Sequence, residues 1–143
     1  MSLKKIIVAD CGAVDVTTCF CGRDKPYEDC CGRVHAGAAP VTAEDLMRAR
    51  YCAFVKGNVD FLAVTLHPDE RAGFNKADVK EFCQSVIWTG LTIHKKTRGG
   101  PQDKRGTVKF TASFIQGMSS GEIRENSLFE RLDGRWFYVK ELN

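Results

Sequence analysis

Four cysteines with the spacing of a metal site lie near the N-terminus. Cys19 and Cys21 enclose one residue, and after eight further residues Cys30 and Cys31 are adjacent. Thiolates are preferred ligands of structural zinc, which takes four of them in a tetrahedron. We therefore predict one structural zinc ion per chain, with four free thiols or a disulfide as the alternative. His35 is a weaker candidate for the fourth metal ligand because Cys31 already completes the set of four. A metal ion with four cysteine ligands has no open coordination position for hydrolytic catalysis.

The segment between the two cysteine pairs is suited to bringing them together. Gly22 and Gly32 each follow a cysteine directly, and glycine lets backbone N–H groups turn toward sulfur without a Cβ clash. Residues 26–29 are expected to form one helical turn with Asp24 as its cap. Such a turn would return the second pair toward the first.

A second group of polar and aromatic side chains is organised by Arg50. On a helical wheel Arg50 falls in the middle of an apolar half, and arginine is rarely buried without a partner. Glu125 is the candidate partner, either as the clamp of a ligand pocket or as a buried structural ion pair. The other residues assigned to this pocket are Tyr51, His67 and Trp88. Because no orienting carboxylate is evident near His67, it is a poor general base, and we assign no catalytic residue.

The composition limits the class of protein. A length of 143 residues allows one ordinary domain with a small appendage. No apolar run approaches the roughly 18 residues of a membrane span, and the apolar start of the chain ends at Asp10, too early for a signal peptide. The seven cysteines are an odd set that fits a reducing compartment, with Cys52 and Cys83 as core side chains. We expect a cytoplasmic protein without membrane contact.

Helices are predicted in the first half of the main domain. Thr42 and Asp45 form a capping box for a helix that should run to about Lys56, where Gly57 stops it. A second helix is expected over residues 59–66 and a weaker third one over residues 78–84.

Strands are predicted in the second half, where the apolar period changes to two. The expected strands are residues 86–96, 105–116, 122–132 and 135–140, and Asp133-Gly134 is a hairpin signal. Helices followed by hairpin-linked strands indicate an α+β fold with an antiparallel sheet. A curved sheet around the first helix would enclose a cone-shaped cavity.

A basic loop connects the first two predicted strands. Its cations are Lys95, Lys96, Arg98, Lys104, Arg105 and Lys109, and Asp103 alone opposes them. Such a loop attracts nucleic acid or other anions, but a solvated hairpin tip is the simpler reading. Nucleic-acid binding is therefore a minor alternative.

Two stretches resemble known families. The cysteine stretch of residues 19–32 resembles the SEC-C zinc motif known from the C-terminus of SecA. The stretches 46–54, 65–68, 88–92, 125–129 and 134–139 resemble the uncharacterised YchJ-like family. The resemblance implies a nuclear-transport-factor-2-like (NTF2-like) α+β cone for residues 41–143, a SEC-C zinc module and linker for residues 19–40, and an N-terminal arm for residues 1–18. Between its cysteine pairs this chain has three acids against two bases, a departure from the basic surface usual in the motif.

The sequence is compatible with three roles. The first is a zinc-binding adaptor or binding protein with a protein partner at the zinc module or a small molecule in the cone. The second is a cone-fold isomerase or dehydratase acting on a small apolar substrate, which would need an acid–base pair in the cavity. The third is association with nucleic acid or the ribosome through the basic loop. We also expect that residues 41–143 would fold without residues 1–40.

Overall fold

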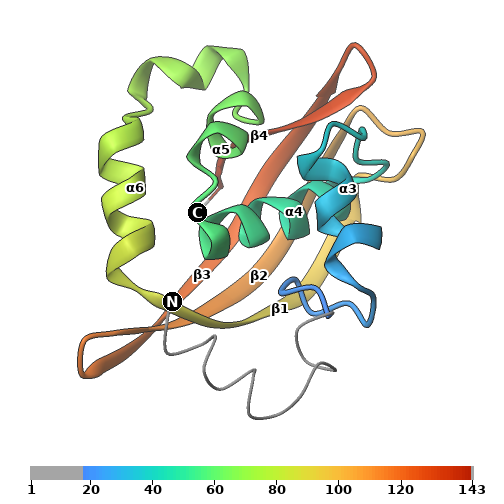
Figure 1. The fold of residues 1–143 in the computed structure, drawn as a ribbon. Coiled ribbons are helices and arrows are strands. Elements are labelled where there is room, and N and C mark those ends of the chain that lie inside the picture. Colours follow the sequence, from blue (N-terminus) through green and yellow to red (C-terminus); the bar gives the residue numbers. More distant parts are fainter. Residues whose placement is uncertain (1–17, 143) are drawn as a thin grey trace.

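A computed structural model describes residues 18–142, in which helices lie on one face of a curved sheet (Figure 1). The N-terminal arm, apart from Thr18, lies outside the described residues. The helical elements are η1 (Tyr27–Asp29), α3 (Cys31–His35), α4 (Ala43–Lys56), α5 (Val59–Val64), η2 (Pro68–Gly73) and α6 (Lys76–Ser85). The strands are β1 (Ile87–Arg98), β2 (Arg105–Gln116), β3 (Ser119–Leu132) and β4 (Arg135–Glu141).

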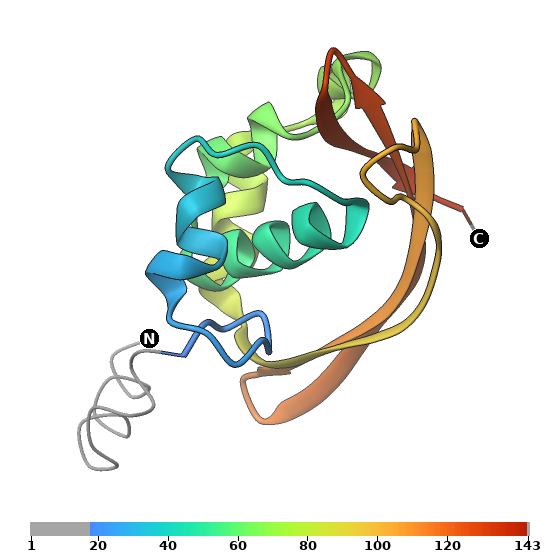
Figure 2. The same ribbon diagram turned by 90° about the vertical axis from the view of Figure 1, so that its right-hand side faces the viewer.

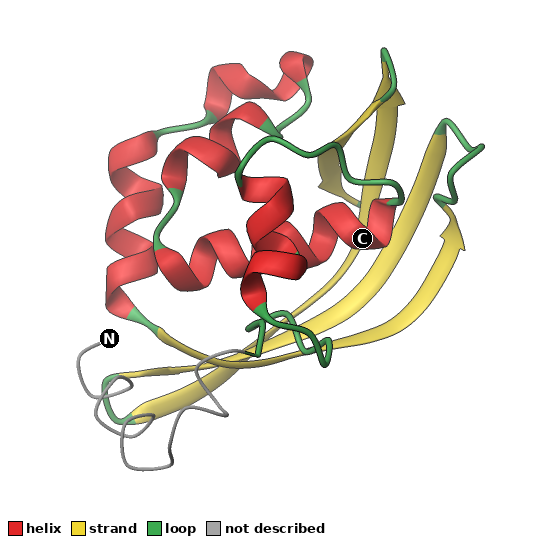
Figure 3. Cartoon of the chain, turned by 45° about the vertical axis from the view of Figure 1, so that its right-hand side comes forward, coloured by secondary structure: helices red, strands yellow, loops and turns green. Residues whose placement is uncertain are grey.

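The sheet is an antiparallel meander in the order β1-β2-β3-β4. It curves around α4, and the described helices gather on its concave face (Figures 2 and 3). The predicted α+β cone is therefore confirmed. None of the helices in residues 18–142 is long and apolar enough to cross a membrane.

Helix α4 begins and ends at the capping residues that the sequence predicts. The Thr42 hydroxyl accepts a hydrogen bond from the Asp45 N–H at 3.0 Å, and the Asp45 carboxylate accepts one from the Thr42 N–H at 3.2 Å. These two bonds are the predicted capping box. At the other end Gly57 adopts a left-handed φ of 71° and stops the helix.

Several element boundaries differ from the sequence prediction. Helix α5 ends at Val64 because Leu66 pairs with Tyr138 of β4 and the His67 N–H donates to the Tyr138 carbonyl at 2.8 Å. Asn75, whose side chain accepts from the Asp78 N–H, starts α6 earlier than predicted. The short helix η2 was missed.

Two further predictions of local structure were wrong. Strand β3 begins at Ser119, three residues before the predicted start at Glu122, because its pairing with β2 extends to the end of the hairpin. Asp24 does not cap the turn between the cysteines, since Pro26 precedes η1 without a side-chain cap. Both outcomes depend on pairing and chain path rather than on local residue preference.

The strand register decides which residues face the helices. Val108, Phe110 and Ala112 of β2 alternate toward the core and are buried. Glu125 is paired with Phe110 across β2 and β3, and directly opposed residues share a face. Glu125 therefore lies on the concave face, toward α4.

Candidate metal centre

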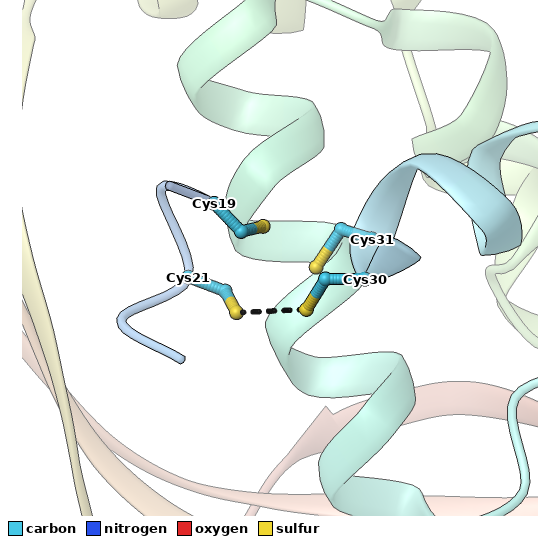
Figure 4. A group of neighbouring side chains, drawn as sticks. All are labelled: Cys19, Cys21, Cys30 and Cys31. Carbon is cyan, nitrogen blue, oxygen red and sulfur yellow. Dashed lines mark hydrogen bonds between the residues drawn. The ribbon is translucent and has the colours of Figure 1, made fainter. Parts of the chain in front are cut away.

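The structure brings the four N-terminal cysteines into one cluster. Their sulfur atoms all lie within 4.8 Å of one another (Figure 4). A tetrahedron with Zn–S bonds of about 2.3 Å has S–S edges of about 3.8 Å, and the Sγ atoms of Cys21 and Cys30 are 3.6 Å apart. The donor set therefore fits a four-coordinate thiolate metal, with Cys30 half-buried and the other three buried.

A short closed loop holds the first cysteine pair. Thr18 and Pro26 form an isolated bridge, and the Cys19 N–H donates to the Lys25 carbonyl at 2.8 Å. Gly22 sits at a φ of 98°, a left-handed conformation that favours glycine. At Gly32 a Cβ would lie 2.6 Å from the Tyr27 carbonyl oxygen, so α3 starts close against η1 only because this residue is glycine.

The cluster is attached to α4 of the main domain. Arg48 donates to the Cys21 carbonyl at 2.6 Å and to Glu44 at 2.8 Å, and Arg23 pairs with Asp45 at 2.8 Å. The buried cysteines belong to the same hydrophobic core as α4 and the sheet. This shared core argues against the expectation that residues 41–143 would fold well alone.

His35 serves as an anchor between the module and α4. Its Nε2 donates to the Ala49 carbonyl at 2.8 Å, so Nδ1 accepts from the Tyr27 hydroxyl at 2.7 Å. Its ring also packs 4.6 Å from that of Phe61, and burial lowers the pKa of His35. Because both nitrogens are engaged with other groups, the geometry does not favour the role of metal ligand.

Replacing His35 with alanine should therefore destabilise the protein and leave its metal content unchanged. Two half-buried hydrogen bonds and a ring contact are lost, so we expect a loss of about 2 kcal/mol in the free energy of unfolding. Chemical denaturation and metal analysis measure the two quantities. The exposed His94, which contacts Thr111, is the control and should cost less than about 0.5 kcal/mol. Loss of the metal from a folded H35A variant would contradict the anchor role.

Cys52 is the residue at this site that the sequence analysis missed. It is fully buried on α4, as predicted, but its Sγ lies 3.4 Å from that of Cys19. The separation of these two residues along the chain gives no local signal of the contact. Only the packing of the cysteine loop on α4 brings them together.

Arg50 does not form the predicted ion pair with Glu125. It is 7% exposed, and its Nη1 donates to the Leu62 carbonyl at 3.0 Å and to the Thr65 hydroxyl at 2.7 Å. Its guanidinium lies over the Tyr138 ring, 4.7 Å from the centroid. Among the described ion pairs within 4.0 Å there is none between Arg50 and Glu125, and burial lowers the pKa of Arg50 to about 10.

Glu125 instead ends a chain of hydrogen bonds on the concave face. Its Oε2 accepts from the Ser127 hydroxyl at 2.9 Å and from the Tyr138 hydroxyl at 3.2 Å. Burial and then the charge of Glu125 raise the pKa of Tyr138 to about 12. Tyr138 thus stands between Arg50 and Glu125 as a neutral link.

Trp88 lies in an aromatic cluster under the helices. Its ring contacts those of Tyr51, Phe54, Phe82 and Phe114 at centroid distances of 5.6 to 5.9 Å. It is 7% exposed, and its Nε1 has no hydrogen-bond partner among the described residues. Burial raises the pKa of the neighbouring Tyr51. Apart from the Tyr51 hydroxyl and this buried Trp88 donor, the cluster is apolar.

His67 has an orienting carboxylate, contrary to the sequence analysis. Its Nδ1 accepts from the Asp69 N–H at 3.1 Å, so Nε2 carries the hydrogen and donates to Glu130 at 3.1 Å. Arg105 holds the other oxygen of Glu130 at 3.0 Å. Glu130 is distant in sequence, which is why it was overlooked. Both ring nitrogens are engaged, so His67 has no free nitrogen for proton transfer.

The largest of the described hollows lies beside strands β1, β2 and β3. It encloses about 790 Å³ and is lined by polar side chains that include Thr92, Lys109 and Arg124. Of the five residues predicted to form a pocket, Glu125 alone contributes to it. The basic loop is partly neutralised, since Lys96 pairs with Glu44 at 2.8 Å and Arg105 with Glu130.

Comparisons with known proteins match both parts of the chain. The family model for the YchJ middle NTF2-like domain matches residues 42–141. A UPF0225 protein from Streptomyces coelicolor is 46% identical over 122 residues, which cover 85% of this chain and 91% of that protein. A UPF0225 protein from Geobacter sulfurreducens is 36% identical over 122 residues, 85% of this chain and 76% of that protein.

Two solved structures share this fold over most of the chain. The solution structure of a SEC-C motif containing protein from Rhodopseudomonas palustris matches with a TM-score of 0.80 and 28% identity, over 87% of this chain and 97% of that chain. The crystal structure of a SEC-C motif containing protein from Psychrobacter arcticus has the same fold, with a TM-score of 0.75 and 22% identity over 89% of this chain and 81% of that chain.

Proposed function

We propose that this chain, which belongs to the family of the YchJ middle NTF2-like domain, is a zinc-stabilised binding protein. The zinc would be held by the SEC-C motif that precedes that domain. In this proposal one zinc ion is held by the sulfurs of Cys19, Cys21, Cys30 and Cys31. The ion fixes the N-terminal loop on α4, and the assembled surface binds a partner. The described cysteines form no disulfide, which is typical of a reducing compartment and supports the cytoplasm as the location in this proposal.

The four-sulfur cluster is the observation that carries this proposal. Four thiolates at tetrahedral spacing suit zinc or a single iron ion, and zinc is the expected occupant because it needs no redox partner. When bound, such an ion supplies structure, since all four positions are filled by protein. The three buried sulfurs and the Arg48 contact to the Cys21 carbonyl hold the loop for it.

The buried polar groups favour a binding role over an enzymatic one. General acid–base catalysis needs a group that reaches the reacting atoms. His67 has both nitrogens engaged, and Arg50 is enclosed by Leu62, Thr65 and Tyr138. We therefore propose an adaptor role in which a protein partner contacts the exposed side of the zinc module.

A small-molecule ligand in the cone is a second candidate, favoured by Trp88. A buried N–H without a partner costs about 1–3 kcal/mol, and a ligand with a hydrogen-bond acceptor would satisfy it. The surrounding aromatic rings would hold the apolar part of such a ligand. The ion pairs of Lys96 with Glu44 and of Arg105 with Glu130 neutralise two of the positive charges of the basic loop. Nucleic acid is therefore the least supported partner.

Native mass spectrometry of the intact, reduced protein tests both the zinc ion and the small-molecule ligand. We expect the mass of the chain plus one zinc ion, and for the second candidate an additional small-molecule mass. The matched control is Trp88→Phe, which keeps a ring and removes the N–H, so it should lose the small molecule and keep the zinc. A fully reduced, folded protein without metal would overturn the zinc proposal. A small-molecule mass that persists in W88F would overturn the assigned contact.

A further inference from the structure

A fifth sulfur lies against the predicted metal centre. Cys52 projects from α4 with no exposed surface, and its Sγ is 3.4 Å from that of Cys19. Cys52 also belongs to the same buried core as Cys19, Cys21 and Cys31. Cys52 therefore adjoins the cluster from the side of the helix, in contact with the Cys19 sulfur.

Cys30 differs from the other three sulfurs of the cluster. Cys19, Cys21 and Cys31 are at most 3% exposed, whereas Cys30 is half-buried. Cys30 lies between η1 and α3, outside both elements, and lines a small surface hollow. A reagent or partner that approaches the centre meets this sulfur first.

We propose that Cys52 is a reserve ligand of the metal centre, able to take the place of Cys30 on the same ion. The other three sulfurs then serve both ligand sets. The distance of 3.4 Å between the Cys52 and Cys19 sulfurs is on the scale of the edge of about 3.8 Å that a four-thiolate tetrahedron requires. This inference rests on the proposed zinc site and deepens it.

The exchange conserves charge at the site. Cys52 releases its thiol proton to solvent as it binds the ion, and the departing Cys30 thiolate takes up one proton from solvent. The second ligand set is wholly buried, whereas the first has one accessible sulfur. The centre would thus keep its metal when Cys30 is captured by a soft electrophile or by the thiol-reactive group of a partner.

Cobalt(II) substitution of the full-length, reduced protein tests this exchange, because thiolate-to-cobalt absorption reports the number of bound sulfurs. We expect Cys30→Ser to bind one cobalt ion with the four-thiolate absorption of the parent protein. In Cys30→Ser/Cys52→Ala the absorption should fall by about a quarter, as three thiolates remain. Its cobalt affinity should fall by about tenfold or more.

The matched control is Cys30→Ser/Cys83→Ala, which removes a buried cysteine on α6 and should behave as Cys30→Ser alone. Should the alanine at position 52 prevent folding, Cys30→Ser/Cys52→Ser gives the same comparison with nearly unchanged volume. The reserve-ligand role is wrong if Cys30→Ser already shows three thiolates and loss of Cys52 changes neither absorption nor affinity. Failure of the parent protein to bind cobalt would instead overturn the proposed zinc site itself.

Discussion

Replacement of Cys19 and Cys31 together by serine should release one zinc ion per chain and destabilise the whole protein. At most three thiols then remain at the site, even with Cys52 counted, and both lost sulfurs come from the shared core. Metal binding contributes directly to folding where the site exists only in the folded state. We expect the free energy of unfolding to fall by about 5 kcal/mol or more.

The measurement combines metal analysis with chemical denaturation of the parent protein and the C19S/C31S variant. Cys83→Ser is the control, because it changes a buried cysteine whose sulfur contacts none of the four, and it should cost about 1 kcal/mol and keep the zinc. If C19S/C31S loses all of its metal and keeps the stability of the parent protein, the ion does not support the fold.

Replacement of Arg50 by alanine should cost about 3 kcal/mol, whereas Glu125→Gln should cost about 1 kcal/mol or less. Arg50 satisfies the Leu62 carbonyl in the last turn of α5, where helical carbonyls lack partners. Its stem is buried, so its packing is lost as well. Glutamine at position 125 can still accept from Ser127 and Tyr138.

Urea denaturation of the two single variants and the double variant measures the coupling. The control is Arg124→Ala, which breaks the exposed pair with Glu122 and should cost less than about 1 kcal/mol. A directly paired Arg50 and Glu125 would give a different pattern, because removal of either partner from a buried pair costs about 3–5 kcal/mol and the effects are not additive. That pattern would restore the ion pair that the sequence suggested.

The secondary structure was largely predictable because its signals are local. The capping box of Thr42 and Asp45, the stop at Gly57 and the alternation in β2 depend on residues close together in the chain. Errors occurred where a distant element intervened. Leu66 leaves the helical pattern to pair with Tyr138 of β4, and no local preference indicates that contact.

For the buried polar groups, too, local signals predicted burial but not the hydrogen-bond partners. The helical wheel indicated that Arg50 is buried, since burial follows from periodicity. Its partners are Leu62, Thr65 and Tyr138, and the last of these depends on where β4 lies. The shared face of Glu125 and Phe110 likewise required the strand register.

The amino-acid sequence alone predicts the four-cysteine cluster as a candidate metal site, the α+β order of elements and the family, because ligand type, spacing and periodicity are properties of short segments. Three features emerge only in the folded chain: the cysteine loop shares a core with α4, His35 anchors this loop, and the Cys52 sulfur lies against that of Cys19. These contacts join residues from separate elements, and their approach is set by packing around one core. No spacing along the chain encodes that geometry.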